Sequence, residues 1–340
     1  MAKLRIGVLY DFWWEDAEKH ADDARPPRKN ADEDVQEVYE ALKRAGHNPV
    51  YLRLDGTPQS LIELATSESD LIFNLVESFG GDDRRDINVA AYLELLGRKF
   101  TGAGASGLYL AQDKALAKKI FAFHGIHTPY FATVYRGRTD HSHDIQFPVI
   151  VKPAREDRSI GIQFGAVCGA IKELMERIDY IHTEFDTPAL IEEYIEGREL
   201  YVSVLGNDKP EALPIVELDL SKLPAGTPKI AGTEVKWEED TDAYKKTKPI
   251  LPQDLGEELE ARLKSVAVQA FQTLQLRDYG RIDFRLALDG TLHVLEVNPN
   301  PYLLPSAEFC MAARQAGRSF PQLIDRIVEV AMARYANGGS

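Results

Sequence analysis

Residues 281–298 place polar side chains at a spacing that could hold a metal ion. Near the middle of this segment lie Asp289 and Gly290, and an Asp-Gly pair is a strong signal for the turn of a β-hairpin. If these two residues form the loop, Leu288 faces Thr291, and the pairing of every other residue in the two strands follows. The segment therefore predicts two antiparallel strands of defined register.

In that register Asp283 lies directly opposite Glu296, and Arg281 lies opposite Asn298. Side chains alternate between the two faces along a strand, so these four polar residues share one face of the hairpin. The other face is apolar and is expected to join the core through Ile282, Phe284, Leu286, Leu295 and Val297.

Two interpretations of the polar face remain open from the hairpin alone. Carboxylates that face each other across a sheet repel, and a cation between Asp283 and Glu296 would remove that repulsion. Carboxylate and amide oxygens suit Mg²⁺, which usually keeps several waters and also binds substrate phosphates. The alternative is a surface hairpin whose acids are neutralised by Arg281 and Arg285.

Lysines elsewhere in the chain could bind an anion. Lys152 ends an apolar strand, where it is expected to point out of the sheet edge at which ligands collect. The turn that follows contains Ser159 and Gly161, where backbone N–H groups could approach phosphate oxygens. Lys114 lies near an expected helix start. Taken singly, each of these features is more often structural than functional.

The expected strand at 190–195 carries two adjacent acids, Glu192 and Glu193. A strand edge with free hydrogen-bonding groups beside apolar residues suits a flat ring such as adenine. The alternative is an ordinary strand with one face exposed to water.

Composition narrows the classes of protein to consider. The 340 residues are 44% hydrophobic and 28% charged, with a formal net charge of −14. This charge argues against non-specific binding to nucleic acid or to anionic membranes. The apolar runs are too short to span a bilayer, and we expect no secretory leader. Cys168 and Cys310 form no metal or redox motif, so we expect a cytoplasmic protein with buried thiols.

The first hundred residues predict a parallel α/β sheet. Strands expected at 4–10, 50–54 and 70–76 alternate with helices near 35–45, 60–66 and 86–96. The Gly-rich stretch 101–107 is expected to join this part to a helix at 108–124. Two long polar loops are expected at 11–34 and 220–252, and a helix at 255–276 precedes the hairpin. Closing helices are expected at 306–316 and 320–335.

The order of these features makes the chain resemble the ATP-grasp superfamily, and within it the D-alanine–D-alanine ligase branch. The most specific stretches are Leu190-Ile191-Glu192-Glu193-Tyr194-Ile195-Glu196-Gly197-Arg198-Glu199-Leu200, Arg281-Ile282-Asp283, Leu295-Glu296-Val297-Asn298 and Met311-Ala312-Ala313-Arg314-Gln315-Ala316-Gly317. The resemblance implies an N-terminal parallel α/β domain (1–107) followed by two α+β subdomains (108–197 and 198–340) that clamp ATP.

The resemblance also implies site roles. Lys114 and Lys152 would touch the ATP phosphates, Glu199 would hold the ribose, and Lys236 on a mobile loop would reach the γ-phosphate. The adenine slot would be lined from the acidic strand, by Glu192, Glu193, Tyr194 and Ile195.

For the chemistry, the resemblance implies that Asp283, Glu296 and Asn298 bind two Mg²⁺ ions, with Mn²⁺ able to substitute. Arg281 would stabilise the developing oxyanion, with Ser159 also placed among the catalytic residues. The implied partners are a small carboxylic acid and an amine. A homodimer is implied as well, although no feature of the sequence marks its interface.

The chain departs from the family around the substrates. The stretch 74–80, which contains Glu77, corresponds to one in which the ligases have a His-Gly pair. Arg158 replaces a serine, Trp237 replaces a tyrosine, and Tyr302 replaces a glycine. A serine that holds the second substrate's carboxylate falls at Ala307, next to Ser306. The substrate candidates are therefore Asp34, Glu77, Arg158, Trp237, Tyr302 and Ser306.

These departures predict an ATP-dependent ligase that forms an amide through an acyl phosphate, with an altered pocket and substrates other than D-alanine. The alternatives are an authentic D-alanine–D-alanine ligase and a non-catalytic nucleotide-binding protein.

Overall fold

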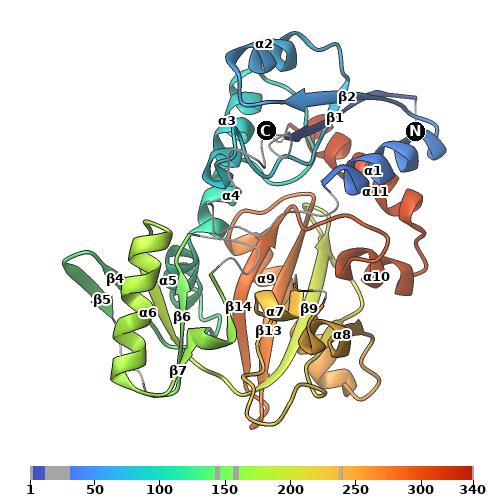
Figure 1. The fold of residues 1–340 in the computed structure, drawn as a ribbon. Coiled ribbons are helices and arrows are strands. Elements are labelled where there is room, and N and C mark those ends of the chain that lie inside the picture. The colour runs from blue at the N-terminus through green and yellow to red at the C-terminus, as the bar shows by residue number, and fades with distance from the viewer. Residues whose placement is uncertain are drawn as a thin grey trace.

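The computed structural model describes residues 3–11, 31–141, 146–155, 161–236, 238 and 240–338. Figure 1 shows three β-sheets, each with its own helices: one at the top of the view, one at the lower left and one at the lower right. The predicted combination of a parallel N-terminal sheet with two mixed α+β parts is confirmed. The sheets fall within the predicted segments 1–107, 108–197 and 198–340 to within one residue, and we retain these domain boundaries as a proposal.

The N-terminal sheet is parallel and has the order β2 (Asn48–Leu54), β1 (Arg5–Asp11), β3 (Leu71–Asn74). Its strands are separated along the chain by helices α1 (Ala31–Arg44) and α2 (Pro58–Thr66), and α3 (Asp86–Leu95) follows β3 after a short 3₁₀ helix, η2 (Asp83–Arg85). The carboxyl ends of β1 and β3 meet at one edge, where ligands of such sheets usually bind.

The helix predicted at 108–124 is wrong in one respect, because the structure has two helices there. They are α4 (Ala105–Gln112) and α5 (Lys114–Phe123), separated by Asp113. The Asp113 side chain accepts a 2.9 Å hydrogen bond from the N–H of Leu116 and caps α5, as aspartate commonly does at a helix start. The break places Lys114 at the first position of α5.

The central sheet is antiparallel, in the order β5 (Arg138–His141), β4 (Phe131–Tyr135), β8 (Ala189–Glu193), β6 (Val149–Pro153), β7 (Val167–Cys168). A 3₁₀ helix, η3 (Phe164–Ala166), precedes β7, and α6 (Ile171–Glu184) covers one face of the sheet. The start of α5 packs on the other face through Ala115. Strand β6 is buried on both faces, which explains its continuous apolar sequence.

The C-terminal sheet has the order β12 (Lys248–Ile250), β11 (Val216–Asp219), β9 (Gly197–Leu205), β13 (Tyr279–Ala287), β14 (Leu292–Pro299), and β10 (Glu211–Ala212) pairs with β9. Helix α9 (Glu257–Thr273) covers its apolar face. The long loop predicted at 220–252 is wrong, because this stretch contains α7 (Thr233–Lys236), α8 (Asp242–Lys246) and β12. Short elements between prolines and polar residues leave no clear periodic signal in the sequence.

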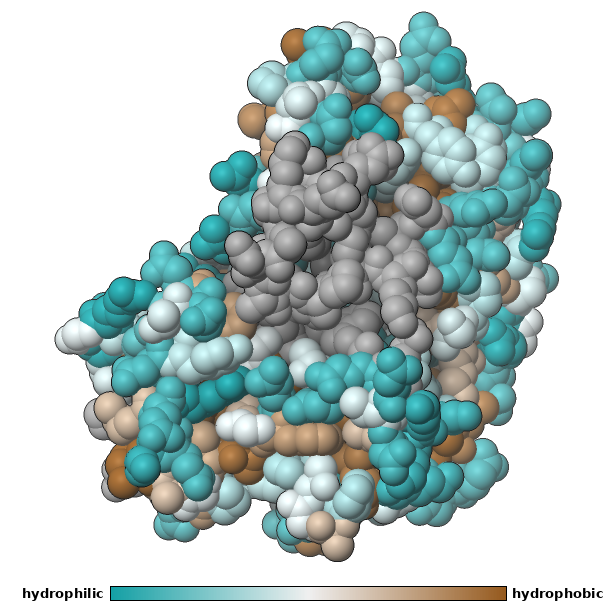
Figure 2. Space-filling view, viewed as in Figure 1, coloured by the Kyte–Doolittle hydropathy of each residue, from teal (hydrophilic) through white to brown (hydrophobic). Residues whose placement is uncertain are grey.

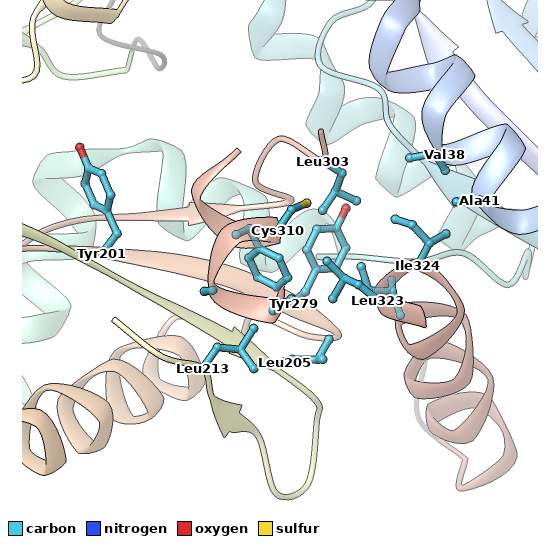
Figure 3. Close-up of a cluster of buried hydrophobic side chains, with 14 of the residues drawn as sticks. Val38, Ala41, Tyr201, Leu205, Leu213, Tyr279, Leu303, Cys310, Leu323 and Ile324 are labelled. Carbon is cyan, nitrogen blue, oxygen red and sulfur yellow. The ribbon is translucent and has the colours of Figure 1, made fainter. Parts of the chain in front are cut away.

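The last two helices, α10 (Glu308–Gln315) and α11 (Phe320–Ala336), join the C-terminal sheet to the N-terminal part. Figure 3 shows Val38 and Ala41 of α1 facing Leu323 and Ile324 of α11. Tyr279 at the start of β13 belongs to the same buried cluster. The two ends of the described chain therefore share one apolar core.

Figure 2 shows hydrophilic residues over most of the coloured part of the visible face, with hydrophobic residues in small separate patches. Scattered apolar residues of this kind are normal on a folded protein. Among the residues that the structure describes, no helix combines the length and the apolar character needed to cross a bilayer.

Candidate functional site

The hairpin of β13 and β14 has the predicted register at its polar residues. Asp283 pairs with Glu296, and Arg281 pairs with Asn298. Strand β9 continues the same surface, because Tyr201 lies opposite Asp283 and Glu199 lies opposite Arg285. The polar hairpin face is thus part of one polar surface across three strands.

The predicted two-residue turn is wrong. Ala287 donates its N–H to the carbonyl of Thr291 at 2.9 Å, which leaves a loop of three residues. Gly290, the last of them, has φ +83°, a backbone conformation that a three-residue hairpin loop requires at this position and that glycine adopts at little cost. Leu288 is 80% exposed instead of facing Thr291 across the hairpin.

A β-bulge on β14 restores the register beyond this turn. The pairing shifts between Asp283 and Phe284, so that Phe284 lies opposite Val294 and Leu295 is the extra residue. A shift of one residue exchanges the two faces of a strand. Val294 therefore enters the core at 1% exposure, and the prediction that Leu295 would do so is wrong.

Arg281 is held by two carboxylates. Its Nε and Nη2 donate to the two oxygens of Asp283 at 2.7 and 2.9 Å, and Nη1 lies 3.4 Å from Oε2 of Glu308. The guanidinium also lies over the ring of Tyr201, 4.7 Å from its centroid. Burial raises the pKa of Asp283 and Glu296 adds to this effect, whereas Arg281 opposes it. Sequence reasoning missed Glu308, whose contact depends on how α10 packs.

Glu296 lies among positive charges from distant segments. Its Oε2 is 3.7 Å from Nζ of Lys114 at the start of α5. Burial opposes ionisation of Glu296, but the charges of Lys114, Lys236 and Lys152 outweigh it and lower its pKa to about 2. The structure therefore brings together, around Glu296, three lysines from separate segments of the sequence.

The donor set of the hairpin fits a hard cation. Asp283 and Glu296 contribute opposed carboxylates, and the buried side-chain nitrogen of Asn298 has no hydrogen-bond partner within the described chain. The oxygen and nitrogen of an amide are assigned and not observed, so its oxygen can serve as a ligand. Within the described residues no three His, Cys, Asp or Glu side chains gather into a metal site by themselves. Two carboxylates and an amide, completed by waters and phosphates, suit Mg²⁺.

The metal-site interpretation and the neutralised-surface interpretation of the hairpin acids are therefore each partly consistent with the structure. Arg281 does pair with Asp283, as the neutralised-surface alternative expected. Arg285 does not neutralise the hairpin acids, since it pairs with Glu199 at 2.9 Å. Asp283 is 2% exposed, so this face does not lie open on the surface.

A second buried network lies between α5 and the central sheet. The carboxylate of Glu192 on β8 is 3.0 Å from Nζ of Lys152 and 3.3 Å from Nζ of Lys118, which also donates to Oγ1 of Thr128 at 2.6 Å. The prediction that Lys152 points out of the sheet edge is wrong, because its side chain pairs with Glu192. Because Ile150 is the residue that pairs with Glu192, Lys152 lies diagonally across the two strands on the same face.

Lys118 is a residue that sequence reasoning missed. It lies one turn after Lys114 on α5, which is the only local signal for it. Both Lys118 and Glu192 have side chains that are 1% exposed. Burial lowers the pKa of Lys118 to about 8, against the opposing effect of Glu192. Burial also disfavours the charged form of Glu192, but Lys118 and Lys152 outweigh it and lower its pKa.

This low pKa predicts that Lys118 makes the protein more stable as the pH rises from about 8 towards 10.5, its ordinary value. In that window the unfolded chain binds more protons than the folded chain, so stability rises with pH. The cost of burying the charged amine is fully present below about pH 8 and is relieved above 10.5. We expect the wild-type free energy of unfolding to gain about 3 kcal/mol relative to Lys118→Met across this window. Urea unfolding at several pH values measures this difference, and a constant difference would contradict the prediction.

The remaining residues of the predicted ATP set lie on β8, on β9 and in the connection between these strands. The hydroxyl of Tyr194 accepts a 2.9 Å hydrogen bond from the N–H of Lys229, while Glu193 and Ile195 are half-buried. Both oxygens of Glu199 are engaged, one by Arg285 at 2.9 Å and one by the hydroxyl of Tyr201 at 2.8 Å. Any contact from Glu199 to a ribose would therefore use its remaining lone pairs.

Three predicted substrate residues meet in one small pocket. Asp34 comes from α1, Glu77 from the loop after β3, and Tyr302 from the loop after β14. Asp11 at the end of β1 positions this pocket, since its carboxylate accepts hydrogen bonds from the N–H of Glu77 and the hydroxyl of Ser78. Sequence reasoning missed Asp11, which the parallel pairing of β1 with β3 brings there.

Ser306 does not line this pocket and is exposed just before α10. Arg158, Ser159 and Trp237 lie outside the described residues, and their predicted roles stay predictions.

A family model described as the D-alanine–D-alanine ligase C-terminus matches residues 120–329, a range that includes Lys152, Asp283 and Glu296 but not Lys114 or Lys118. The chain belongs to the D-alanine–D-alanine ligase family. A D-alanine–D-alanine ligase from Desulforamulus reducens is 30% identical over 87% of this chain and 91% of its own. A protein from Sinorhizobium fredii, named uncharacterized protein y4sG, is 34% identical over 89% of this chain and 88% of its own.

The fold agrees with this family membership. The crystal structure of a D-alanine–D-alanine ligase from Bacillus anthracis complexed with ATP superimposes with a TM-score of 0.74. The match covers 99% of this chain and 100% of the other at 23% sequence identity. The fold implied by the sequence resemblance is therefore confirmed over nearly the whole chain.

Proposed function

We propose that this protein is an ATP- and Mg²⁺-dependent carboxylate–amine ligase that forms an amide through an acyl phosphate. The observation that carries the proposal is the junction of a cluster of lysines with the paired acids of the hairpin. Lys114 at the start of α5 contacts Glu296, which lies opposite Asp283 and its partner Arg281. Such a junction places phosphate-binding cations beside oxygen ligands for a metal ion.

The residues of the two networks have distinct proposed roles. Lys114, Lys152 and Lys236 hold the phosphates of ATP, residues 192–195 at and after the end of β8 hold the adenine, and Glu199 holds the ribose. Asp283, Glu296 and Asn298 hold the Mg²⁺ ions, with Mn²⁺ able to substitute. When bound, the metal neutralises charge that develops on the transferred phosphoryl group.

The chemistry begins with a carboxylate oxygen attacking the γ-phosphorus of ATP. The bond from that phosphorus to the β–γ bridging oxygen breaks, and ADP leaves with the electron pair. The acceptor amine, after its ammonium has lost a proton, attacks the acyl carbon, and the carbon–oxygen bond breaks to release phosphate. Arg281 can donate a remaining N–H to the oxyanion of this second step, where fixed donors contribute most. Lys236 and its loop would exclude water that hydrolyses the acyl phosphate.

We further propose that the substrates differ from those of D-alanine–D-alanine ligases. The pocket between α1, β3 and the loop after β14 carries Asp34, Glu77 and Tyr302, and two of these depart from the family pattern. Arg158 and Trp237 remain further candidates. We also propose that the protein is cytoplasmic and forms a homodimer. Analytical ultracentrifugation of the purified chain would measure the oligomeric state.

The test is ADP formation and hydroxamate formation with purified protein, Mg²⁺, ATP and pooled carboxylic acids, including D- and L-amino acids. Hydroxylamine intercepts an acyl phosphate without needing the natural amine. We expect hydroxamate that depends on one pool, and deconvolution of that pool identifies the acid. Strong turnover of D-alanine with itself would contradict the altered pocket. ATP binding without ADP or hydroxamate from any pool would favour the non-catalytic nucleotide-binding alternative.

A further inference from the structure

The acceptor side of the site is negatively charged where a second amino acid would need a cation. At the proposed reaction site, Arg281 is a side chain that could attract a carboxylate. Asp283 and Glu308 both contact it already. Two carboxylates more than balance one guanidinium charge. Glu308 therefore offsets the charge with which Arg281 would attract an incoming carboxylate.

Glu308 also occupies the start of helix α10, where a substrate carboxylate could otherwise bind. The N-cap of this helix is Ala307, which makes no side-chain capping bond, and Glu308 occupies its first turn. The partial positive charge of a helix start attracts anions, and here the chain supplies one itself. The Glu308 side chain is 25% exposed, so a substrate can reach it. A carboxylate on an acceptor bound at this helix start would meet Glu308.

The pocket lined by Asp34 and Glu77 also contains acidic side chains. The loop that leads from β14 into α10 lines it with Asn300, Pro301, Tyr302 and Leu303, and the other walls include Asp34 and Glu77. Among the described residues that line this pocket there is no lysine, arginine or histidine. A positively charged group fits these walls better than a second carboxylate does.

We propose that Glu308 is a specificity-determining residue and that the acceptor is a primary amine without a carboxylate on the carbon beside its nitrogen. This inference rests on the proposed ligase function and adds the class of the second substrate. Glu308 contacts the ammonium of the amine and repels the carboxylate of an amino acid that competes for the same place.

Matched pairs of acceptors test the proposal, because the members of each pair differ only by the carboxylate. Suitable pairs are agmatine with arginine, putrescine with ornithine, cadaverine with lysine, and ethylamine with alanine. With the donor acid identified by hydroxamate formation, amide product is quantified by mass spectrometry. We expect at least one amine to exceed its amino acid by about tenfold or more in kcat/KM, and no amino acid to exceed its amine. Glu308→Gln should reduce this ratio to about threefold or less, chiefly through the KM of the acceptor.

The matched control is Glu258→Gln, an exposed glutamate in the first turn of α9, which should leave the ratio unchanged. If Glu308 only supports Arg281, its replacement lowers kcat equally for every acceptor, hydroxylamine included, and leaves the ratio unaltered. That result would overturn the proposal, as would a preference for the amino acids. Hydroxamate formation without turnover of any carboxylate-free amine would also overturn it while leaving the ligase function intact. Absence of hydroxamate with every acid would remove the ligase function and this inference together.

Discussion

Replacing Asp283 with asparagine and Glu296 with glutamine in one variant should reduce substrate-dependent ADP release by about 10³-fold or more. The variant keeps the shape of both side chains but removes the two charges that face each other across β13 and β14. Without them the hairpin loses its strongest oxygen ligands for Mg²⁺, and the charge that develops during phosphoryl transfer is no longer neutralised. Steady-state ADP release with the identified acid measures the loss.

A control pair makes the same chemical changes away from the site. Asp289→Asn in the exposed hairpin turn, combined with Glu258→Gln on α9, should retain activity near that of the wild type. A second measurement does not depend on turnover. Together with a non-hydrolysable ATP analogue, Mg²⁺ should raise the thermal midpoint of the wild type and of the control but not of the site variant. Comparable activity in the site variant and the control would exclude these acids as metal ligands.

Replacing Glu192 with glutamine should lower the free energy of unfolding by about 3–5 kcal/mol. Glu192 is the carboxylate between Lys118 and Lys152, and all three residues are less than 8% exposed. Glutamine keeps the volume but leaves two buried ammonium groups without a counter-charge, which is far more costly than losing an exposed ion pair. Urea unfolding at pH 7 measures the change.

The neighbouring residue provides the control for this substitution. Glu193 is half-buried on the opposite face of β8, and Glu193→Gln should change the free energy of unfolding by less than about 1 kcal/mol. A further comparison uses pH. Without Glu192, which raises the pKa of Lys118, this amine should lose its proton below pH 8, so the defect of Glu192→Gln should shrink as the pH rises towards 8. Equal losses in the two variants would show that the buried network does not stabilise the fold.

Part of the fold and of the site follows from local patterns in the sequence. Alternating strands and helices predicted the parallel N-terminal sheet, because a buried strand and an amphipathic helix have different periods. The pairing of Asp283 with Glu296 was also predicted correctly, but only because an error in the turn length and a missed bulge cancelled each other. The three-residue turn at Gly290 and the bulge at Leu295 shift the register in opposite directions, and neither has a clear local signal.

Lys114, Lys152 and Glu192 were selected from the sequence because each lies at a recognisable point of a helix or strand. Their partners were not predictable in the same way. Lys118 became a candidate only when the packing of α5 against β8 placed its amine beside Glu192. Glu308 and Asp11 gained their roles from the docking of α10 and from the pairing of β1 with β3.

By itself, the sequence determined the family, the alternation of strands and helices in the N-terminal part and the residue types that could do chemistry. Only the tertiary structure decided which charges lie together, which lysine is buried, and which acids Arg281 contacts. The physical reason is that periodicity and turn chemistry act between residues a few positions apart. The electrostatics of the site depend on distances between segments separated by tens to hundreds of residues, and packing sets those distances.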